Sequence, residues 1–132
     1  MNIKSIFENF KTIAVIGFSD KPFRDSFNIA RYLLSKGFKV YGVNPRLAGL
    51  NIEGIECYDK LADIPDKIQI VDVFRNPDYL PELIDEILTL DYKPEVIWTQ
   101  LEVINPVAKR KAEENGFIYI ENKCIFIEHR NS

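Results

Sequence analysis

The chain has 132 residues, of which 46% are hydrophobic and 28% charged, and its formal net charge is -3 at pH 7. This length suits one domain, and the composition is that of a globular protein with a core rather than a disordered chain. The negative net charge argues against a broad basic surface for nonspecific nucleic-acid binding, but it is compatible with a small basic pocket.

Cysteine content and the first residues narrow the class further. Cys57 and Cys124 are too few and too far apart for a disulfide framework or a zinc site. The N-terminal residues lack the apolar core of a signal peptide, and no apolar run approaches the roughly 20 residues of a membrane helix. We therefore expect one cytoplasmic domain over 1–132, with neither a membrane nor a nucleic acid as partner.

Predicted strands and helices alternate from the first apolar run onward. Residues 12–17 form a continuous apolar, β-branched run that ends in glycine, which is typical of a strand buried on both faces. Residues 26–35 carry apolar side chains at helical spacing, with Ser26 as the candidate N-cap. A second strand is predicted at 38–43, before an Asn-Pro pair.

The alternation continues in the second half of the chain. A glycine-containing connection is expected at 47–56, with a short extended piece at Ile52 and one helical turn at 61–65. The remaining predicted elements are a strand at 68–74, a helix from Pro77 to Leu90, a strand at 95–98, a helix at 105–115, a strand at 117–120, and a sixth strand or covering segment at 124–127.

This order of elements predicts an α/β fold, a three-layer, doubly wound parallel sheet of about five strands. Ligands of such sheets bind beyond the carboxyl ends of the strands, where the strand order reverses. The search for a site therefore concentrates on four loops, which follow Gly17, Val43, Phe74 and Trp98.

The first loop leaves its strand at a glycine and leads into a helix N-terminus. Its candidate ligand-binding residues are Gly17, Phe18, Ser19, Lys21, Arg24 and Ser26. Free backbone amides and the positive end of the helix dipole favour a phosphate, and Lys21 and Arg24 can add charge-assisted hydrogen bonds. The loop lacks the G-x-G-x-x-G pattern of dinucleotide sites, and a surface loop with two solvated cations is the alternative interpretation.

The second loop distinguishes between nucleotides. An NAD site usually has an acidic residue at the end of its second strand, where the carboxylate holds the ribose. This chain instead has Asn44, Pro45 and Arg46. Arg46 suits a phosphorylated ribose, as in NADP or in the 3′-phosphorylated ADP of coenzyme A, unless the segment is only a turn with a solvated charge.

The third and fourth loops add one more cation and several hydrogen-bonding groups. Phe74 and Arg75 end the third strand, where the ring could flank an adenine or belong to the core. Thr99 and Gln100 follow the fourth strand and suit a neutral part of a ligand. Arginine in three of the four loops favours an anionic ligand more than any one loop does.

These residues also resemble a known family, the small CoA-binding proteins, which are similar to the nucleotide-binding domain of the succinyl-CoA synthetase alpha subunit. The matching segments are 13–22, Arg24-x-Ser26, 41–45, 63–65, 71–75, 98–100, 103–105, Cys124 and Glu128-His129. The resemblance implies a Rossmann-type domain that binds coenzyme A or acyl-CoA, with the phosphates on the first loop, the adenosine at the second, and the remainder along the third and fourth.

Two positions depart from the family pattern. Glu102 stands where glycine is expected, which puts the role of the fourth loop in doubt, and Asn122-Lys123 stands where an Asp-Arg pair is usual.

Little in the sequence supports catalysis. The synthetase relative uses a phosphorylated histidine on a second domain, and His129 here has no nucleophile or orienting partner at a defined spacing. Cys124 is expected to be a small buried side chain, or else a thiol near the ligand that Lys123 activates for a mixed disulfide with CoA.

The leading hypothesis is a nonenzymatic CoA or acyl-CoA binding module. The alternatives are an NADP-binding or redox-sensing module, and a subunit that docks a separate catalytic chain to complete an acyl-CoA ligase.

Overall fold

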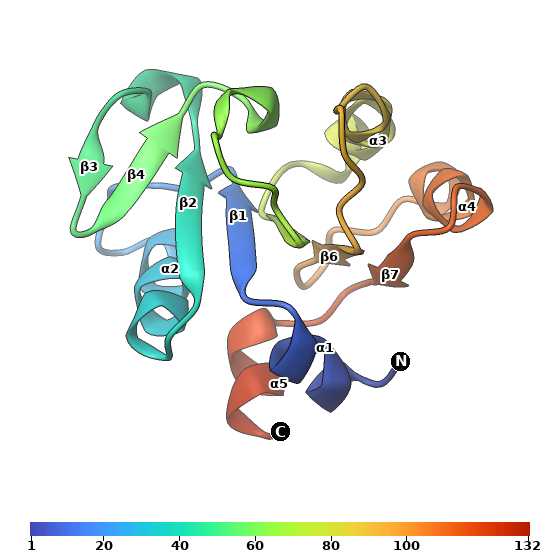
Figure 1. Cartoon of the computed structure of the whole chain (residues 1–132), viewed down its shortest axis with the longest axis horizontal. Helices are drawn as coiled ribbons and strands as arrows, with labels where there is room; N and C mark the ends of the chain where they lie inside the picture. The colour runs from blue at the N-terminus through green and yellow to red at the C-terminus, as the bar shows by residue number, and fades with distance from the viewer.

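A computed structural model describes all residues, 1–132, and contains one seven-stranded sheet (Figure 1). The strand order is β3-β4-β2-β1-β5-β6-β7, and every neighbouring pair is parallel except β3 and β4. The strands are β1 Thr12–Ile16, β2 Lys39–Val43, β3 Asn51–Ile52, β4 Ile55–Tyr58, β5 Ile70–Val73, β6 Val96–Thr99 and β7 Ile118–Ile120. The doubly wound α/β prediction is confirmed, with seven strands against about five predicted.

Helices cover both faces of the sheet, and alternate strand residues point to opposite sides. The helices are α1 Ile3–Asn9, α2 Asp25–Ser35, α3 Leu80–Leu88, α4 Pro106–Glu114 and α5 Ile125–Arg130. Ile13 and Val15 of β1 pack in a core with α1, α2 and α5. Ala14 and Ile16 pack in a second core with α3 and α4. This burial on both faces explains the uninterrupted apolar run of β1. None of the helices has the length and apolar character needed to span a bilayer.

The sequence prediction missed β4 near one end of the sheet, whereas the short extended piece expected at Ile52 is β3. Residues 47–56 were expected to form a connection, but they hold β3 and the start of β4. In β4, Ile55 and Cys57 are buried, Glu56 is exposed, and Tyr58 is half-buried against the second core. Such an alternation over only four residues is a weak strand signal. It is also preceded in the chain by Gly49 and Gly54 and followed by polar residues.

Two further predictions are corrected at helices. The segment 124–127 is not a sixth strand, because α5 begins at Ile125. Of the two predictions for this segment, the structure confirms the covering segment. A short apolar run cannot distinguish a buried strand from a helix by periodicity alone. Ser26 is not the N-cap of α2, because Arg24 occupies that position and Ser26 lies in the first helical turn.

The strand order reverses beside β1. From β1 the chain passes to β2 and on to β4, and then returns to β5 on the other side of β1. The segments that follow β1 and β5 lead to helices on opposite faces of the sheet, α2 and α3, and a crevice lies above the point where the two loops begin.

Candidate functional site

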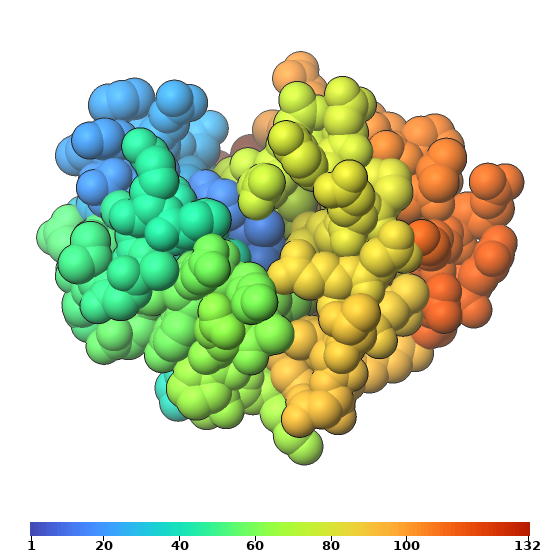
Figure 2. Space-filling view, turned by 90° about the horizontal axis from the view of Figure 1, so that it is seen from above, coloured from blue at the N-terminus to red at the C-terminus, as the bar shows by residue number.

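The crevice lies where the loops after β1 and β5 approach each other closely. Gly17 has a φ of 85°, and its N–H donates to the Val43 carbonyl oxygen at 3.0 Å. A Cβ on Gly17 would lie 2.7 Å from the Phe74 carbonyl oxygen, so glycine is required for both its φ and this close approach. Figure 2 looks down on this edge and shows a hollow between the first two loops, in blue and teal, and the segment after β5, in yellow-green.

Two serine hydroxyls organise the first loop. The Ser26 Oγ accepts the Ser19 N–H at 3.0 Å, and the Ser19 Oγ accepts the Lys21 N–H at 3.0 Å. Arg24, at the N-cap of α2, makes no side-chain cap hydrogen bond. The first turn of α2 therefore presents backbone amides that no capping side chain satisfies, which favours an anion there.

Asn44 connects the second loop to the first. Its Nδ2 donates to the Phe18 carbonyl oxygen at 2.9 Å, and its Oδ1 accepts the Arg46 N–H at 2.9 Å. Pro45 begins the 3-10 turn that displays Arg46 on the surface. Because both ends of the Asn44 amide bind the protein, this side chain positions the loops rather than offering free groups to a ligand.

Most of the predicted residues from the first three loops line a single pocket of about 370 Å³, called here the first-loop pocket. It is lined by Gly17, Phe18, Ser19, Arg24, Asp25, Ser26, Asn44, Arg46 and Phe74. Lys21 and Pro45 do not line it. Asp25 is its one carboxylate, and this charge would oppose an anionic ligand beside it.

Two more pockets adjoin the first, and Arg75 lines both of them. The Cys124 pocket, of about 250 Å³, is lined by Asp25, Ile29, Phe74, Arg75, Gln100, Leu101, Val103 and Cys124. The α3 pocket, of about 240 Å³, is lined by Ile16, Val43, Asp59, Lys60, Val73, Arg75, Tyr79, Leu80, Glu82, Leu83 and Glu86. The Arg75 guanidinium carbon lies 5.0 Å from the centroid of the Tyr79 ring.

Sequence reasoning missed the α3 pocket. Asp59 and Lys60 follow β4 directly, so they occupy the carboxyl end of a strand that was not predicted. Recognition of that strand would have added its loop to the four that were searched.

Thr99 and Gln100 lie deeper than the sequence suggested. Thr99 is fully buried, and its Oγ1 accepts the Asn122 N–H at 3.1 Å. The Gln100 Nε2 donates to Asp72 Oδ1 at 3.1 Å and to the Lys123 carbonyl oxygen at 3.2 Å. Both side chains therefore attach β6 to the segment before α5. Gln100 still lines the Cys124 pocket, whereas Thr99 lines none of the three.

Phe18 and Asp72 lie in the interior beneath the site. Phe18 is fully buried, and its ring occupies the space where a Cβ on Gly42 would lie. Phe18 can therefore serve a ligand only through its backbone. Asp72 is also fully buried, its Oδ2 has no hydrogen-bond partner, and burial raises the pKa of its carboxyl well above the usual value.

The three arginines of the crevice make no ion pairs. Arg24, Arg46 and Arg75 are all exposed, and the five ion pairs of the protein join other residues. A protein of net charge -3 thus has three arginines without an ion-pair partner around one crevice, although Asp59, Glu82 and Glu86 line the α3 pocket beside Arg75. The first-loop pocket, with two arginines and one carboxylate, is the part of the crevice that favours an anion despite the overall negative charge.

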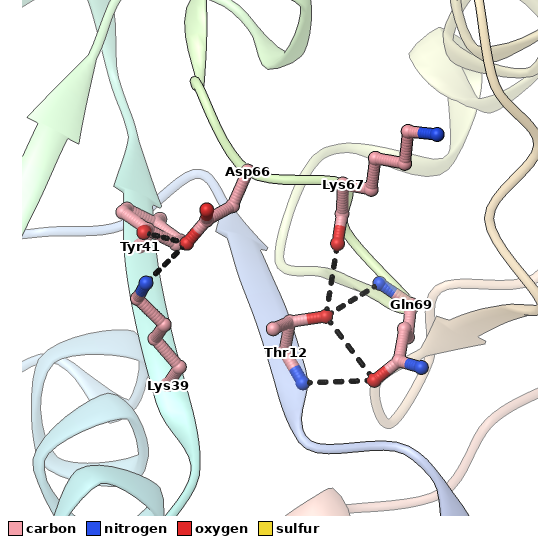
Figure 3. A network of polar contacts seen from close by, with 6 residues as sticks. All are labelled: Thr12, Lys39, Tyr41, Asp66, Lys67 and Gln69. Carbon is pink, nitrogen blue, oxygen red and sulfur yellow. Dashed lines mark hydrogen bonds and ion pairs between the residues drawn. The ribbon is translucent and has the colours of Figure 1, made fainter.

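The amino edge of the sheet has the opposite character (Figure 3). Lys39 Nζ lies 2.5 Å from Asp66 Oδ2, which also accepts from the Tyr41 hydroxyl. These two hydrogen bonds lower the pKa of the Asp66 carboxyl. Beside them, the Thr12 Oγ1 donates to the Lys67 carbonyl oxygen at 3.1 Å and accepts the Gln69 N–H at 3.0 Å. The polar groups of this network bind one another, so they do not resemble a ligand site.

The two residues considered for chemistry lie at opposite ends of the last helix. Cys124 is half-buried and lines the Cys124 pocket. His129 lies among the aromatic rings of Phe7, Tyr32 and Phe38, and its Nδ1 is 2.7 Å from the Tyr32 hydroxyl. Burial, together with Lys36 and Lys11, lowers the pKa of His129. Its contacts attach α5 to α1 and α2, and it lines none of the three pockets.

Relatives and solved structures share this arrangement. The uncharacterized protein YneT of Bacillus subtilis is 33% identical over 127 residues, which cover 96% of this chain and 91% of YneT. A structure from Thermus thermophilus has a TM-score of 0.92 at 32% identity and covers 99% of this chain and 98% of its own. A hypothetical protein from Pyrococcus horikoshii has a TM-score of 0.90 at 37% identity, with 98% and 88% covered.

Larger proteins match over only a small part of their length. The alpha subunit of the ADP-forming acetate–CoA ligase I of Pyrococcus furiosus is 29% identical over 90 residues, which are 65% of this chain but 19% of that subunit. The sequence profile of a family described as a CoA binding domain matches residues 11–130, nearly the whole chain. The chain therefore belongs to the family of CoA binding domains.

Proposed function

We propose that this protein binds coenzyme A in the crevice at the carboxyl ends of β1, β2 and β5, as a binding or regulatory module without a catalytic step of its own. The observation that carries the proposal is the set of three exposed arginines, free of ion pairs, around one crevice. Coenzyme A carries a diphosphate and a 3′-phosphate, so its charge matches these cations.

The residues present fit the phosphates of this ligand. Gly17 leaves room for close approach of a ligand to the backbone, and the first turn of α2 offers amides without a side-chain cap. We assign the diphosphate to this turn and to Arg24, and the 3′-phosphate to Arg46. Asp25 opposes the diphosphate, and the positive charge of Arg24 offsets this repulsion.

The other two pockets suit the uncharged parts of the ligand. The α3 pocket has an apolar floor of Ile16, Val43 and Val73 with charged residues around it, which suits a purine ring with polar edges. The pantetheine arm would then pass Arg75 and Phe74 toward the Cys124 pocket.

Titration calorimetry with coenzyme A and dephospho-CoA tests the assignment of Arg46. Arg46→Ala should weaken binding of coenzyme A by about 10-fold or more, because a hydrogen bond to a charged group contributes about 1.5–3 kcal/mol. The same variant should leave the affinity for dephospho-CoA almost unchanged, since that ligand lacks the 3′-phosphate. Arg110→Ala is the matched control, because Arg110 is exposed on α4, outside all three pockets.

Two results would count against this function. If Arg46→Ala loses the same affinity for both ligands, Arg46 does not bind the 3′-phosphate. Failure of coenzyme A to bind at millimolar concentration, with tight binding of NADPH, would favour the NADP-binding alternative, because Arg46 suits a 2′-phosphate equally well.

The ligase-subunit alternative is favoured by one observation, the match to a ligase alpha subunit of which this chain spans only 19%. If this chain completes such an enzyme, it should co-purify with a larger chain, and ADP-forming ligase activity should appear only in the mixture. If the protein in a cell extract elutes from gel filtration at the position of the purified protein, this alternative is contradicted.

A further inference from the structure

The Cys124 pocket differs in character from the first-loop pocket, although the two share Asp25 and Phe74. Most of its lining is apolar, from Ile29, Phe74, Leu101, Val103 and Cys124. The first-loop pocket, by contrast, is lined mainly by polar and charged residues. A ligand that occupies both pockets must therefore be charged at one end and apolar at the other.

The buried polar side chain of the Cys124 pocket, Gln100, already makes its hydrogen bonds within the protein. Both donors of the Gln100 amide are used, on Asp72 Oδ1 at 3.1 Å and on the Lys123 carbonyl oxygen at 3.2 Å. Its Oε1 accepts the Ile125 N–H at 3.4 Å. The remaining charged groups are Asp25 and Arg75, both exposed. The interior of this pocket thus has few free groups for a polar ligand.

An exposed leucine marks the mouth of this pocket. Leu101 lines the pocket and is 57% exposed, and Ile104 in the same loop is 47% exposed. Asn122 Oδ1 accepts the Glu102 N–H at 2.7 Å, and both residues have positive φ values, 57° and 69°. This hydrogen bond joins the Leu101 loop to the segment before α5, and the left-handed conformation is common for asparagine but unusual for glutamate. Leu101 and Ile104 therefore expose apolar surface in this loop, which a bound apolar group would remove from water.

We infer that the Cys124 pocket takes the apolar acyl chain of an acyl-CoA thioester, with Leu101 closing over the chain, so that the protein favours acyl-CoA over free coenzyme A. The inference rests on the proposed function, because the phosphates must lie in the first-loop pocket for the chain to reach this one. Acyl groups that end in a carboxylate are disfavoured, because Asp25 lines the pocket, Glu102 lies in the loop at its mouth, and the guanidinium of Arg75, the one cation of the lining, lies beside the Tyr79 ring of the α3 pocket.

Titration calorimetry with coenzyme A and its acetyl, butyryl, hexanoyl and succinyl thioesters tests this inference. Affinity should rise by about 4-fold for each buried methylene until the pocket is full, which corresponds to ~0.8 kcal/mol per methylene. Butyryl-CoA should bind more tightly than succinyl-CoA, which has the same chain length with a carboxylate at its end. Each affinity is expressed relative to that of free coenzyme A for the same variant.

Leu101→Ser should reduce the gain in affinity per methylene, because it replaces one apolar wall of the pocket with a hydroxyl. Leu50→Ser is the matched control, because Leu50 is 49% exposed but lines none of the three pockets, and it should retain the full rise. Both positions are exposed, so neither change removes a core side chain.

The outcomes separate this inference from the proposed function. Equal affinities for coenzyme A and all thioesters, a rise with chain length that Leu101→Ser leaves intact, or tighter binding of succinyl-CoA than of butyryl-CoA would each overturn the acyl pocket and leave CoA binding standing. Absence of binding by coenzyme A and by every thioester would overturn both.

Discussion

Asp72 should make the stability of the protein depend on pH in an unusual direction. It lies in β5, in register with Val15 of β1 and Trp98 of β6, and it is fully buried. Its Oδ1 accepts from Gln100, while its Oδ2 has no partner. Burial raises the pKa of this carboxyl well above 3.8, so the folded protein keeps the proton at pH values where the unfolded chain has released it.

The magnitude follows from this difference in bound protons. Below pH 3.8 both states are protonated, and Asp72 adds no pH dependence. Between that value and the raised pKa of the folded state, the native protein holds one more proton than the unfolded chain. Stability therefore falls as pH rises, by about 1.4 kcal/mol per pH unit. The loss is complete once pH exceeds the folded pKa.

Asp72→Asn isolates this contribution, because asparagine cannot ionise and its Oδ1 can still accept from Gln100. Urea unfolding, followed by the fluorescence of the single tryptophan, gives the free energy of unfolding at each pH between about 4 and 7. The free energy of the native protein minus that of the variant should fall from about pH 4 upward until pH reaches the raised pKa of the folded state. Asp63→Asn, which replaces an exposed carboxylate, is the matched control for the loss of one charge. A difference that stays constant with pH for Asp72→Asn would mean that Asp72 is ionised in the folded protein.

Three further predictions use the same unfolding assay or a thiol reagent. Gly17→Ala should lower the free energy of unfolding by about 2–4 kcal/mol, because alanine is strained at this φ and overlaps the Phe74 carbonyl; a loss below about 1 kcal/mol would contradict the close approach. Because burial raises the pKa of Cys57 to about 11, a thiol reagent at about pH 8 should modify only Cys124 in the native protein, and rapid modification of both thiols would refute this. The lowered pKa of His129 means that the unfolded chain takes up a proton first as pH falls below 6.5, so stability should decrease there, and His129→Phe should abolish that decrease if this residue causes it.

The fold could be predicted from the sequence where burial alone determines the pattern. β1 and β5 are buried on both faces, and both were predicted as strands, since β1 is a continuous apolar run and β5 departs from one only at Asp72. β4 could not be predicted in this way, since it alternates over only four residues, and its omission concealed Asp59 and Lys60 of the α3 pocket. The short apolar run that became α5 has no periodicity of its own, and its conformation depends on what it packs against.

The location of the candidate site residues could be predicted, but the contacts of each side chain could not. The positions of Arg24, Arg46 and Arg75 follow from topology, because any residue after a parallel strand lies at the carboxyl edge. The contacts of Asn44, Thr99 and Gln100 do not follow, because each of these residues binds a partner that is 23 to 28 residues away in the chain. Such partners become known only once the tertiary structure is known.

The charged residues at the two edges of the sheet differ in whether they have partners within the protein. At the amino edge, Lys39 and Asp66 pair with each other, and the charge of each is neutralised within the protein. At the carboxyl edge, Arg24 and Asp25 are neighbours in sequence but form no ion pair, and the arginine remains exposed. An exposed cation without a partner contributes little to folding, so its removal should change stability by less than about 0.5 kcal/mol. Losses of affinity in the arginine variants can therefore be attributed to contacts with the ligand rather than to unfolding.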